Sequence, residues 1–266
     1  MPSDLLDRAG LTLEVRPPRA TITLNRPESL NAQTPHTWAA LAAIGDSLRD
    51  QVNDQVRVVV VRGAGRAFSA GLDRRMFDPA GLDGVPSMAG LATMTEAEAE
   101  AHLAGFQAGF AWLREPRWLT VAAVQGHAIG GGFQLALACD LRVVADDAKF
   151  SMAEVTLGIV PDLGGTYPLV SAVGYARAVE ICLSGRRVGA AEAVDIGLAL
   201  RSVPNAELDA TVDQLVDSLT AAPAGATAAT LGLLSAIVDG AGPAEALANE
   251  RAAQARRLRS LVAGTG

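Results

Sequence analysis

Two short and nearly continuous apolar runs constrain the fold of this chain more than any other feature. Val56–Val61 and Leu119–Val124 carry almost no polar positions, in contrast to the alternation expected of a strand with one wet face. Such runs are typical of strands that are buried on both faces. Strands of this kind occur in parallel sheets with helices on either side, so the sequence predicts an α/β fold.

The flanking segments fit the same class. Thr12–Val15 and Ala20–Leu24 are predicted as short strands joined by a turn at Pro17-Pro18. Thr34 followed by Pro35 predicts the start of a helix that runs to about Asp50, because Thr caps a helix well and Pro suits its first turn. Its apolar stripe consists of Trp38, Leu41, Ile44 and Leu48.

The second half of the chain changes from mixed to purely helical patterns. Residues 72–95 show no periodicity and are expected to form a mobile loop. A helix is predicted over Glu96–Arg114, and a helical pattern continues beyond Val203 with breaks near Pro223 and Pro243. We therefore divide the chain into an α/β core, residues 1–200, and a helical tail, residues 201–266. Three further segments are predicted: a helix over Phe133–Cys139 and strands over Leu141–Ala145 and Lys149–Met152.

Charge and hydropathy exclude several classes of function. The 266 residues carry a formal net charge of −7, which argues against a general role at nucleic acids or anionic membranes. No apolar run reaches the roughly 18 residues of a membrane span. Met1–Gly10 has no apolar stretch of the kind found in signal peptides, and Cys139 and Cys182 suit buried thiols, so a cytoplasmic location is expected.

Several familiar motifs are incomplete. Gly63-Ala64-Gly65 lacks the third glycine of a dinucleotide fingerprint, and no phosphate-binding Gly-Lys-Ser/Thr occurs. Ser69 lies in a degenerate version of a hydrolase nucleophile turn, but no histidine follows in the C-terminal part. No Cys, His, Asp and Glu have the spacing of metal ligands, so no metal site is predicted.

Two loops of small residues follow the two apolar runs. They are Arg66–Asp73 and Gly126–Gln134, and the second contains the triplet Gly130-Gly131-Gly132 at the start of a helix. Small residues let a ligand approach the main chain, and a helix N-terminus offers free N–H groups. Two such donors aimed at one oxygen would form an oxyanion hole.

These loops resemble those of a known family when they are taken with two other segments. Leu24–Ala32, Ala67–Asp73, Gly126–Asp140 and Phe150–Thr166 resemble, in this order, the signatures of the crotonase (enoyl-CoA hydratase/isomerase) family. The resemblance implies a spiral core of ββα units and a C-terminal helical region that forms trimers or dimers of trimers. It also implies an acyl-CoA thioester substrate, with coenzyme A as part of the substrate and no separate cofactor.

The resemblance also implies roles for individual residues. The thioester oxygen would be held by the N–H groups of Ala70 and Gly131, and the adenine end of CoA would lie along the loop Phe68–Gly71. Arg26 and Arg66 are candidates for the CoA phosphates. The full set of predicted CoA-binding residues is Arg26, Arg66, Phe68, Ser69, Gly71 and Asp73.

The family's hydratases use two glutamates, and this chain departs from that pattern. The first position is Gln134 and the second is Glu154. An amide cannot take a proton from water at neutral pH, whereas one carboxylate suffices to shuttle a proton along an acyl chain. We therefore predict isomerisation of an unsaturated acyl-CoA, with Glu154 as the acid and base.

Asp162 is the second candidate carboxylate, and it keeps other interpretations open. It lies in Pro161-Asp162-Leu163-Gly164-Gly165, just ahead of a helix, where it could equally cap a turn. One alternative is a hydratase that uses Glu154 with Asp162 or Gln134. The other is a non-catalytic relative that only binds acyl-CoA.

Overall fold

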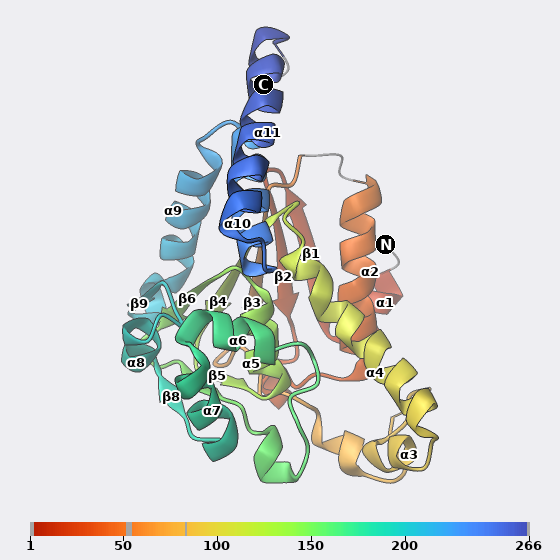
Figure 1. Ribbon diagram of the computed structural model, residues 1–266. Helices are drawn as coiled ribbons and strands as arrows, with labels where there is room; N and C mark the ends of the chain where they lie inside the picture. Colours follow the sequence, from red (N-terminus) through yellow and green to blue (C-terminus); the bar gives the residue numbers. More distant parts are fainter. Residues whose placement is uncertain (1–2, 52–54, 83, 265–266) are drawn as a thin grey trace.

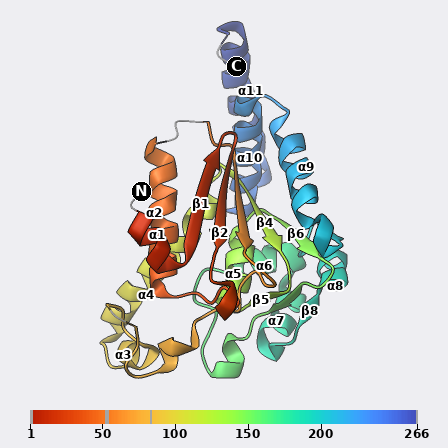
Figure 2. The same ribbon diagram turned by 180° about the vertical axis from the view of Figure 1, so that it is seen from behind.

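The computed structural model describes residues 3–51, 55–82 and 84–264, and within them the strands form two sheets (Figures 1 and 2). The larger sheet has the order β1-β2-β3-β4-β6-β9, in which β1 and β2 are antiparallel and the later neighbours are parallel. The smaller sheet has the order β5-β7-β8. The strands are β1 (Leu11–Arg16), β2 (Arg19–Leu24), β3 (Val58–Gly63), β4 (Leu119–Val124), β5 (His127–Ile129), β6 (Leu141–Ala145), β7 (Lys149–Ser151), β8 (Val188–Gly189) and β9 (Arg201–Val203).

Helices cover the sheets and then continue to the C-terminus. The α-helices are α1 (Ser3–Ala9), α2 (Pro35–Gln51), α3 (Met88–Ala92), α4 (Glu96–Ala111), α5 (Gly131–Ala138), α6 (Thr166–Val173), α7 (Tyr175–Ser184), α8 (Ala190–Asp195), α9 (Leu208–Thr220), α10 (Ala224–Val238) and α11 (Pro243–Val262). Short 3₁₀ helices are η1 (Pro27–Ser29), η2 (Arg74–Phe77), η3 (Trp112–Arg114), η4 (Glu154–Leu157) and η5 (Asn205–Glu207).

The main sheet is buried on both faces, as its apolar runs predict. In β3, Val59 and Val61 belong to the core on the side of α2 and α5. Val58 and Val60 face the other way and pack with residues of α9, including Val212. The alternation of side chains along a strand thus supplies two separate apolar layers, and a polar residue on either face of β3 would lie in one of them.

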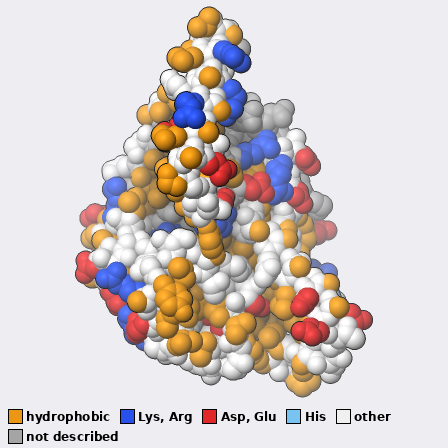
Figure 3. All heavy atoms as spheres, viewed as in Figure 1, with side chains coloured by type: hydrophobic (Ala, Val, Ile, Leu, Met, Phe, Trp, Pro, Cys, Tyr) orange, Lys and Arg blue, Asp and Glu red, His pale blue; other side chains and the backbone are white. Residues whose placement is uncertain are grey.

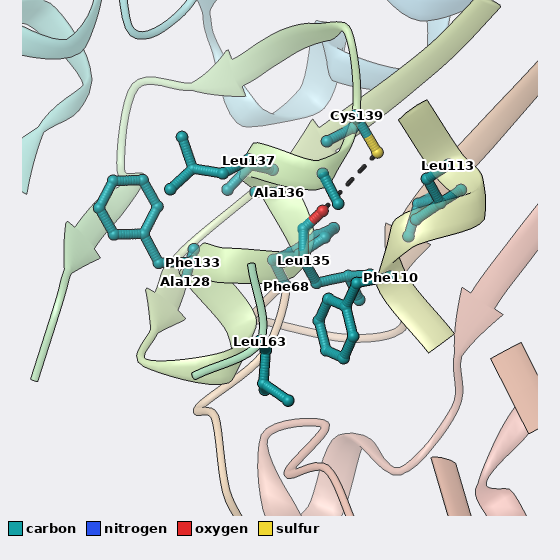
Figure 4. Close-up of a cluster of buried hydrophobic side chains, with 14 of the residues drawn as sticks. Phe68, Phe110, Leu113, Ala128, Phe133, Leu135, Ala136, Leu137, Cys139 and Leu163 are labelled. Carbon is teal, nitrogen blue, oxygen red and sulfur yellow. Dashed lines mark hydrogen bonds between the residues drawn. The ribbon is translucent and has the colours of Figure 1, made fainter. Parts of the chain in front are cut away.

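Helix α5 runs through the centre of the larger core, where every one of its residues is buried (Figure 4). Phe133 packs against Phe150 of β7, with ring centroids 5.0 Å apart. Leu135 and Leu137 are fully buried beside it. The helix begins two residues before the predicted start at Phe133, and its first turn is therefore formed by the glycines themselves.

Residues 72–95 contain more regular structure than the predicted mobile loop. Asp73 caps η2 by accepting from the N–H of Arg75, and Ser87 caps α3 by accepting from the N–H of Gly90. Thr95 then forms a reciprocal capping box at the start of α4. These local hydrogen bonds stabilise single turns that hydrophobic periodicity cannot reveal. Residue 83 of this segment lies outside the described residues, as do residues 1–2, 52–54 and 265–266 of the predicted core and tail.

The structure moves the end of the core beyond the predicted boundary at residue 200. Strand β9 (Arg201–Val203) pairs with β6 in the main sheet, and α9 packs across that sheet. Helix α11 projects beyond the rest of the molecule in both ribbon views, whereas α10 contacts the core, where the carbonyl of Val238 accepts from the hydroxyl of Tyr167 (Figures 1 and 2). Within the described residues no single helix is long and apolar enough to span a membrane. The helix pair 205–220 and 224–238, which is bent by 101°, would together have the length and apolar composition of a span.

Helices α10 and α11 expose large apolar side chains (Figure 3). Helix α10 has no buried residue, and α11 has only Ala253 buried among its described side chains. The exposed large side chains of the two helices are Leu234, Ile237, Val238, Leu247, Leu258, Leu261 and Val262.

Candidate active site

The two small-residue loops meet through backbone hydrogen bonds. The N–H of Ser69 donates to the carbonyl of His127 at 2.8 Å, and Ile129 donates to the carbonyl of Ser69 at 3.0 Å. On the other side of the first loop, the N–H of Ala70 donates to the carbonyl of Leu30 at 2.8 Å. Ala70 therefore has no free N–H to offer a ligand, and its predicted place in an oxyanion hole is wrong.

Leu72, two residues further along the loop, has the free N–H that Ala70 lacks. Gln33 donates to the carbonyl of Gly71 at 2.7 Å and accepts from the N–H of Asp73 at 2.8 Å. In this parallel bridge Leu72 lies between Gly71 and Asp73, so its N–H points away from Gln33. Among the described residues, no acceptor is recorded for the N–H of Leu72 or of Gly131. Both residues line the same two cavities, so these two N–H groups are the available donors.

Gly71 allows the two donor loops to approach each other. Its φ is +85°, and a Cβ at this position would lie 2.4 Å from the carbonyl oxygen of Ile129 and 3.4 Å from the nitrogen of Gly131. The first distance is impossible for a real side chain, and the contact is with backbone, which cannot rotate away. The glycine is thus required by both its conformation and its surroundings.

A Gly71→Ala substitution should therefore disrupt the site more than its size suggests. We expect it to lower stability by about 2 kcal/mol or more and to reduce turnover at least tenfold, since an L-residue at positive φ and a backbone displacement both contribute. Gly174→Ala is the matched control, because Gly174 has a φ of +78° with nothing within 4 Å of the added Cβ. Thermal unfolding and activity of the two variants, measured side by side, would contradict this account if both behaved alike.

Glu154 and Gln134 are hydrogen-bonded to each other in the buried centre of the site. The amide Nε2 of Gln134 donates to Oε1 of Glu154 at 2.7 Å. The other end of the amide is fixed as well, because its Oε1 accepts from the N–H groups of Leu163 at 2.8 Å and Gly165 at 3.2 Å. Since those backbone groups can only donate, the amide oxygen must face them and the NH₂ group must face Glu154.

This arrangement leaves one carboxylate oxygen of Glu154 available. Glu154 is 6% exposed, and its Oε2 is buried without a hydrogen-bond partner among the described residues. Burial raises the pKa of the Glu154 carboxyl, and the negative charge of Asp162 adds to the effect, while the amide of Gln134 acts against it. A buried carboxylate with one unpaired oxygen and a raised pKa is suited to accept and return a proton.

Asp162 lies at the same site. It is half-buried, and burial raises the pKa of its carboxyl. It lines one cavity together with Glu154 and Gln134, while its backbone carbonyl accepts from Nε2 of Gln107 at 2.8 Å. The structure thus brings together all three predicted catalytic residues.

Two cavities meet at Glu154. The inner cavity, of about 50 Å³, is mainly apolar and is lined by Trp38 and Phe106 among others, whereas the outer cavity has a volume of about 470 Å³. They share four residues, Leu72, Gly131, Glu154 and Ile159. A ligand that occupied both cavities would therefore pass Leu72, Gly131 and Glu154.

Several residues predicted to bind CoA have structural contacts instead. Phe68 and Ser69 are 0% exposed, so neither can contact a ligand in this conformation. Arg26 donates to Oδ2 of Asp73 at 3.0 Å, and Arg75 binds the same oxygen at 2.7 Å. These ion pairs lower the pKa of Asp73 strongly, with the hydrogen bonds from Arg75 as the largest cause. The predicted roles of Phe68, Ser69 and Asp73 as ligand contacts are therefore wrong, and Arg26 stabilises the loop through Asp73.

The predicted role of Arg66 at the CoA phosphates stays a prediction. Arg66 is exposed but lines neither cavity. Arg74 lines the outer cavity, as does Gly71, and within the described part of the chain it forms no ion pair. Sequence reasoning missed Arg74 because it lies in the segment without periodicity. The grouping of Arg74 and Arg75 in the sequence was the one signal available.

Comparisons with known proteins identify the family of this chain. A sequence profile for the enoyl-CoA hydratase/isomerase family matches residues 19–259. The chain belongs to the enoyl-CoA hydratase/isomerase family. The family match confirms the predicted resemblance, and it extends through the C-terminal helices that the sequence signatures did not cover.

Solved structures of the family confirm the crotonase fold. A candidate enoyl-CoA hydratase from Thermobifida fusca YX, in complex with CoA, has a TM-score of 0.91 and 45% identity over 98% of each chain. A structure from the same organism with acetoacetyl-CoA has a TM-score of 0.91 and 45% identity, over 97% of this chain and 98% of that one. The probable enoyl-CoA hydratase echA8 of Mycobacterium tuberculosis (strain CDC 1551 / Oshkosh) is 37% identical over 187 residues. That alignment takes in 70% of this chain and 66%, just under two thirds, of the relative.

Proposed function

We propose that this member of the family is an enoyl-CoA isomerase. It moves a double bond from C3–C4 to C2–C3 of an acyl-CoA thioester. The observation that carries the proposal is the fixed amide of Gln134, which faces Glu154 with its NH₂ group and cannot accept a proton. Glu154 is then the base, and its Oε2, which has no hydrogen-bond partner among the described residues, is the oxygen that accepts the proton.

The proposed reaction uses one base and two backbone donors. Oε2 of Glu154 removes a proton from C2, and the electrons of that C–H bond move toward the thioester oxygen to form a dienolate. The N–H groups of Leu72 and Gly131 stabilise the negative charge on this oxygen. The carboxylic acid then returns the proton at C4, the C3–C4 double-bond electrons form the new bond to hydrogen, the thioester carbonyl re-forms and a double bond forms between C2 and C3.

The two cavities would divide the substrate between them. The acyl tail would enter the inner cavity toward Trp38 and Phe106, and the pantetheine arm would leave through the outer cavity past Arg74. The solved relatives with CoA and acetoacetyl-CoA support a CoA thioester as the ligand. An exposed Arg74 can attract a phosphate group as a mobile cation.

A hydratase remains the second candidate. It is favoured by Asp162, whose half-buried carboxyl lines the inner cavity with Glu154, and by relatives that are named enoyl-CoA hydratases. In that reaction Glu154 and Asp162 would hold a water between them. A relative that binds acyl-CoA without turnover is a third candidate, which a substrate test distinguishes.

We also propose that α10 and α11 join copies of this chain, in a trimer or a dimer of trimers. The support is the row of large apolar side chains that these helices expose, from Leu234 to Val262. Such a surface is unfavourable in water and is stabilised by contact with an equivalent surface. Light scattering of the purified protein gives the mass of the assembly.

The test of the proposed function is turnover of 3-enoyl-CoA substrates of several chain lengths. Appearance of the conjugated 2-enoyl chromophore is the expected result. Binding of every ester without any product would contradict the proposal and favour the non-catalytic relative.

The pH dependence of this reaction should report on Glu154. Burial raises the pKa of its carboxyl, and the base must be ionised, so kcat/KM should fall as the pH drops through a value above the roughly 4.3 of an exposed glutamate. The acid limb should have the slope of a single proton. Asp162→Asn should shift the limb to lower pH, because it removes a negative charge that disfavours ionisation of Glu154. An acid limb at the ordinary glutamate value, unmoved in the variant, would contradict the assignment.

A further inference from the structure

Gln33 is a completely buried glutamine that the proposed chemistry does not use. It is 0% exposed and lies between the two donor loops and the wall of the inner cavity. A buried amide is costly to desolvate unless each of its groups is paired, so its contacts indicate what it holds in place.

The side chain of Gln33 has three hydrogen-bond contacts with three different parts of the site. Its Oε1 accepts from Nε1 of Trp38 at 2.9 Å. Its Nε2 donates to Oγ of Ser69 at 3.1 Å and to the carbonyl of Gly131 at 3.3 Å. The amide thus joins the wall of the inner cavity to both loops.

The backbone of Gln33 fixes the peptide that carries the second N–H donor, that of Leu72. Its N–H and carbonyl bind the residues on either side of Leu72, at 2.7 Å to Gly71 and 2.8 Å to Asp73. Gln33 therefore fixes the peptide that carries the Leu72 N–H through its backbone, and Gly131 through its side chain. One residue sets the relative position of the two N–H groups.

The orientation of the amide is determined by Trp38. An indole N–H can only donate, so the Gln33 oxygen must face it and the NH₂ group must face Gly131 and Ser69. Trp38 is itself held by Phe106, with ring centroids 4.8 Å apart, and both rings line the inner cavity. The hydrogen-bonded chain consequently runs from the acyl end of the site to the thioester end.

We infer that Gln33 is the positioning residue of the oxyanion hole, which keeps the N–H groups of Leu72 and Gly131 aimed at one oxygen. The inference rests on the proposed function, since it concerns the same two donors. On this inference the Gln33 amide affects the stabilisation of the transition state, and not only the stability of the folded protein. Geometric errors of about 1 Å in a catalytic group can reduce a rate by about 10²-fold.

The experiment compares the polarisation of a bound thioester in the wild type and in Gln33→Leu. Butyryl-CoA labelled with ¹³C at the carbonyl is a suitable probe, because its saturated chain does not react. Infrared difference spectra should show a carbonyl stretch shifted to lower frequency in the wild type and a much smaller shift in Gln33→Leu. With a reactive 3-enoyl-CoA, kcat should fall about 10- to 100-fold while KM changes less than about threefold.

Two further variants keep the test decisive. Thr37→Val is the matched control, because the buried Thr37 hydroxyl donates to the carbonyl of Ala9 at 2.9 Å and contacts neither donor loop. It should lower the melting temperature without changing the carbonyl shift or kcat. Trp38→Phe removes the N–H that orients the amide together with part of the ring that packs against Phe106. It should reduce both the carbonyl shift and kcat, and it is the alternative variant if Gln33→Leu does not fold.

The outcomes separate this inference from the proposed function. A wild-type protein that binds butyryl-CoA without any carbonyl shift has no working oxyanion hole, which overturns both. A shifted wild type with the same shift and kcat in Gln33→Leu overturns the inference and leaves the proposed function standing. A loss of shift in the folded variant, with Thr37→Val unaffected, supports the positioning role.

Discussion

Replacing Glu154 by Gln should lower kcat by about 10²–10⁴-fold and leave KM within a few-fold of its original value. The range is that of a well-placed general acid or base. The substitution keeps the shape of the side chain, and the new amide oxygen can still accept from Nε2 of Gln134, so the site should retain its geometry. Only the group that takes the proton is lost. Steady-state kinetics with a 3-enoyl-CoA provide the measurement.

Asp162→Asn is the companion variant for this prediction. It changes a carboxyl in the same cavity without altering the contacts of Gln134 and Glu154. We expect a much smaller effect on kcat than in Glu154→Gln. If the order were reversed, with Glu154→Gln within a few-fold of wild type, the proton shuttle would have to be assigned to Asp162.

Replacing Gln134 by Glu should change the reaction that the site favours. The new carboxylate would accept from the N–H groups of Leu163 and Gly165 with one oxygen and place the other near Oε1 of Glu154, where the amide now lies 2.7 Å away. Two carboxylates this close share a proton, and the second can activate a water. We expect hydration of 2-enoyl-CoA to rise by about 10²-fold or more, while isomerisation falls. Product mass distinguishes the two, since hydration adds a water.

Gln134→Met separates the charge from the shape in this experiment. Methionine has a similar volume but neither accepts the N–H groups of Leu163 and Gly165 nor donates to Glu154. It should lose about 1–3 kcal/mol of stability for the unpaired buried donors and gain no hydration activity. Equal hydration by the Glu and Met variants would show that water enters the site for steric reasons, contrary to the role given to the amide.

The elements of the core were predictable because burial leaves a direct trace in the sequence. Leu119–Val124 is β4 to the residue, and the stripe Trp38, Leu41, Ile44 and Leu48 is buried as expected of α2. The pairing of Gln134 with Glu154 followed from the family pattern, and the structure places the two in contact. In these places the local pattern and the final environment coincide.

The direction of individual backbone groups was not predictable in the same way. Ala70 and Leu72 lie in one loop of small residues, and only the partners at Leu30 and Gln33 determine which N–H is free. Those partners are some 40 residues away in the chain. The ion pair of Arg26 with Asp73 is another long-range contact, and it converts two apparent ligand-binding charges into a stabilising pair.

Burial of the first loop, Arg66–Asp73, was not predictable from the sequence, again because it depends on a long-range partner. Phe68 and Ser69 belong to a segment whose small residues indicate a close approach, but the approaching partner is β5 and not a ligand. Gln33 gave no signal at all, because a single polar residue before a helix is ordinarily exposed or part of a cap. Its role depends on three contacts, at positions 38, 69 and 131, that the fold assembles.

The central claim is that a single carboxylate, Glu154, moves a proton along the acyl chain while Gln134 prevents activation of water. The most direct measurement is the product mass after separate incubations of a 3-enoyl-CoA and of the matching 2-enoyl-CoA with the protein in H₂¹⁸O. The account predicts that the first substrate gives a 2-enoyl-CoA of unchanged mass and that the second takes up no ¹⁸O. Conversion of the 2-enoyl-CoA to a 3-hydroxyacyl-CoA that carries one ¹⁸O, with the 3-enoyl-CoA left unchanged, would contradict it, and the second acid would then be Asp162.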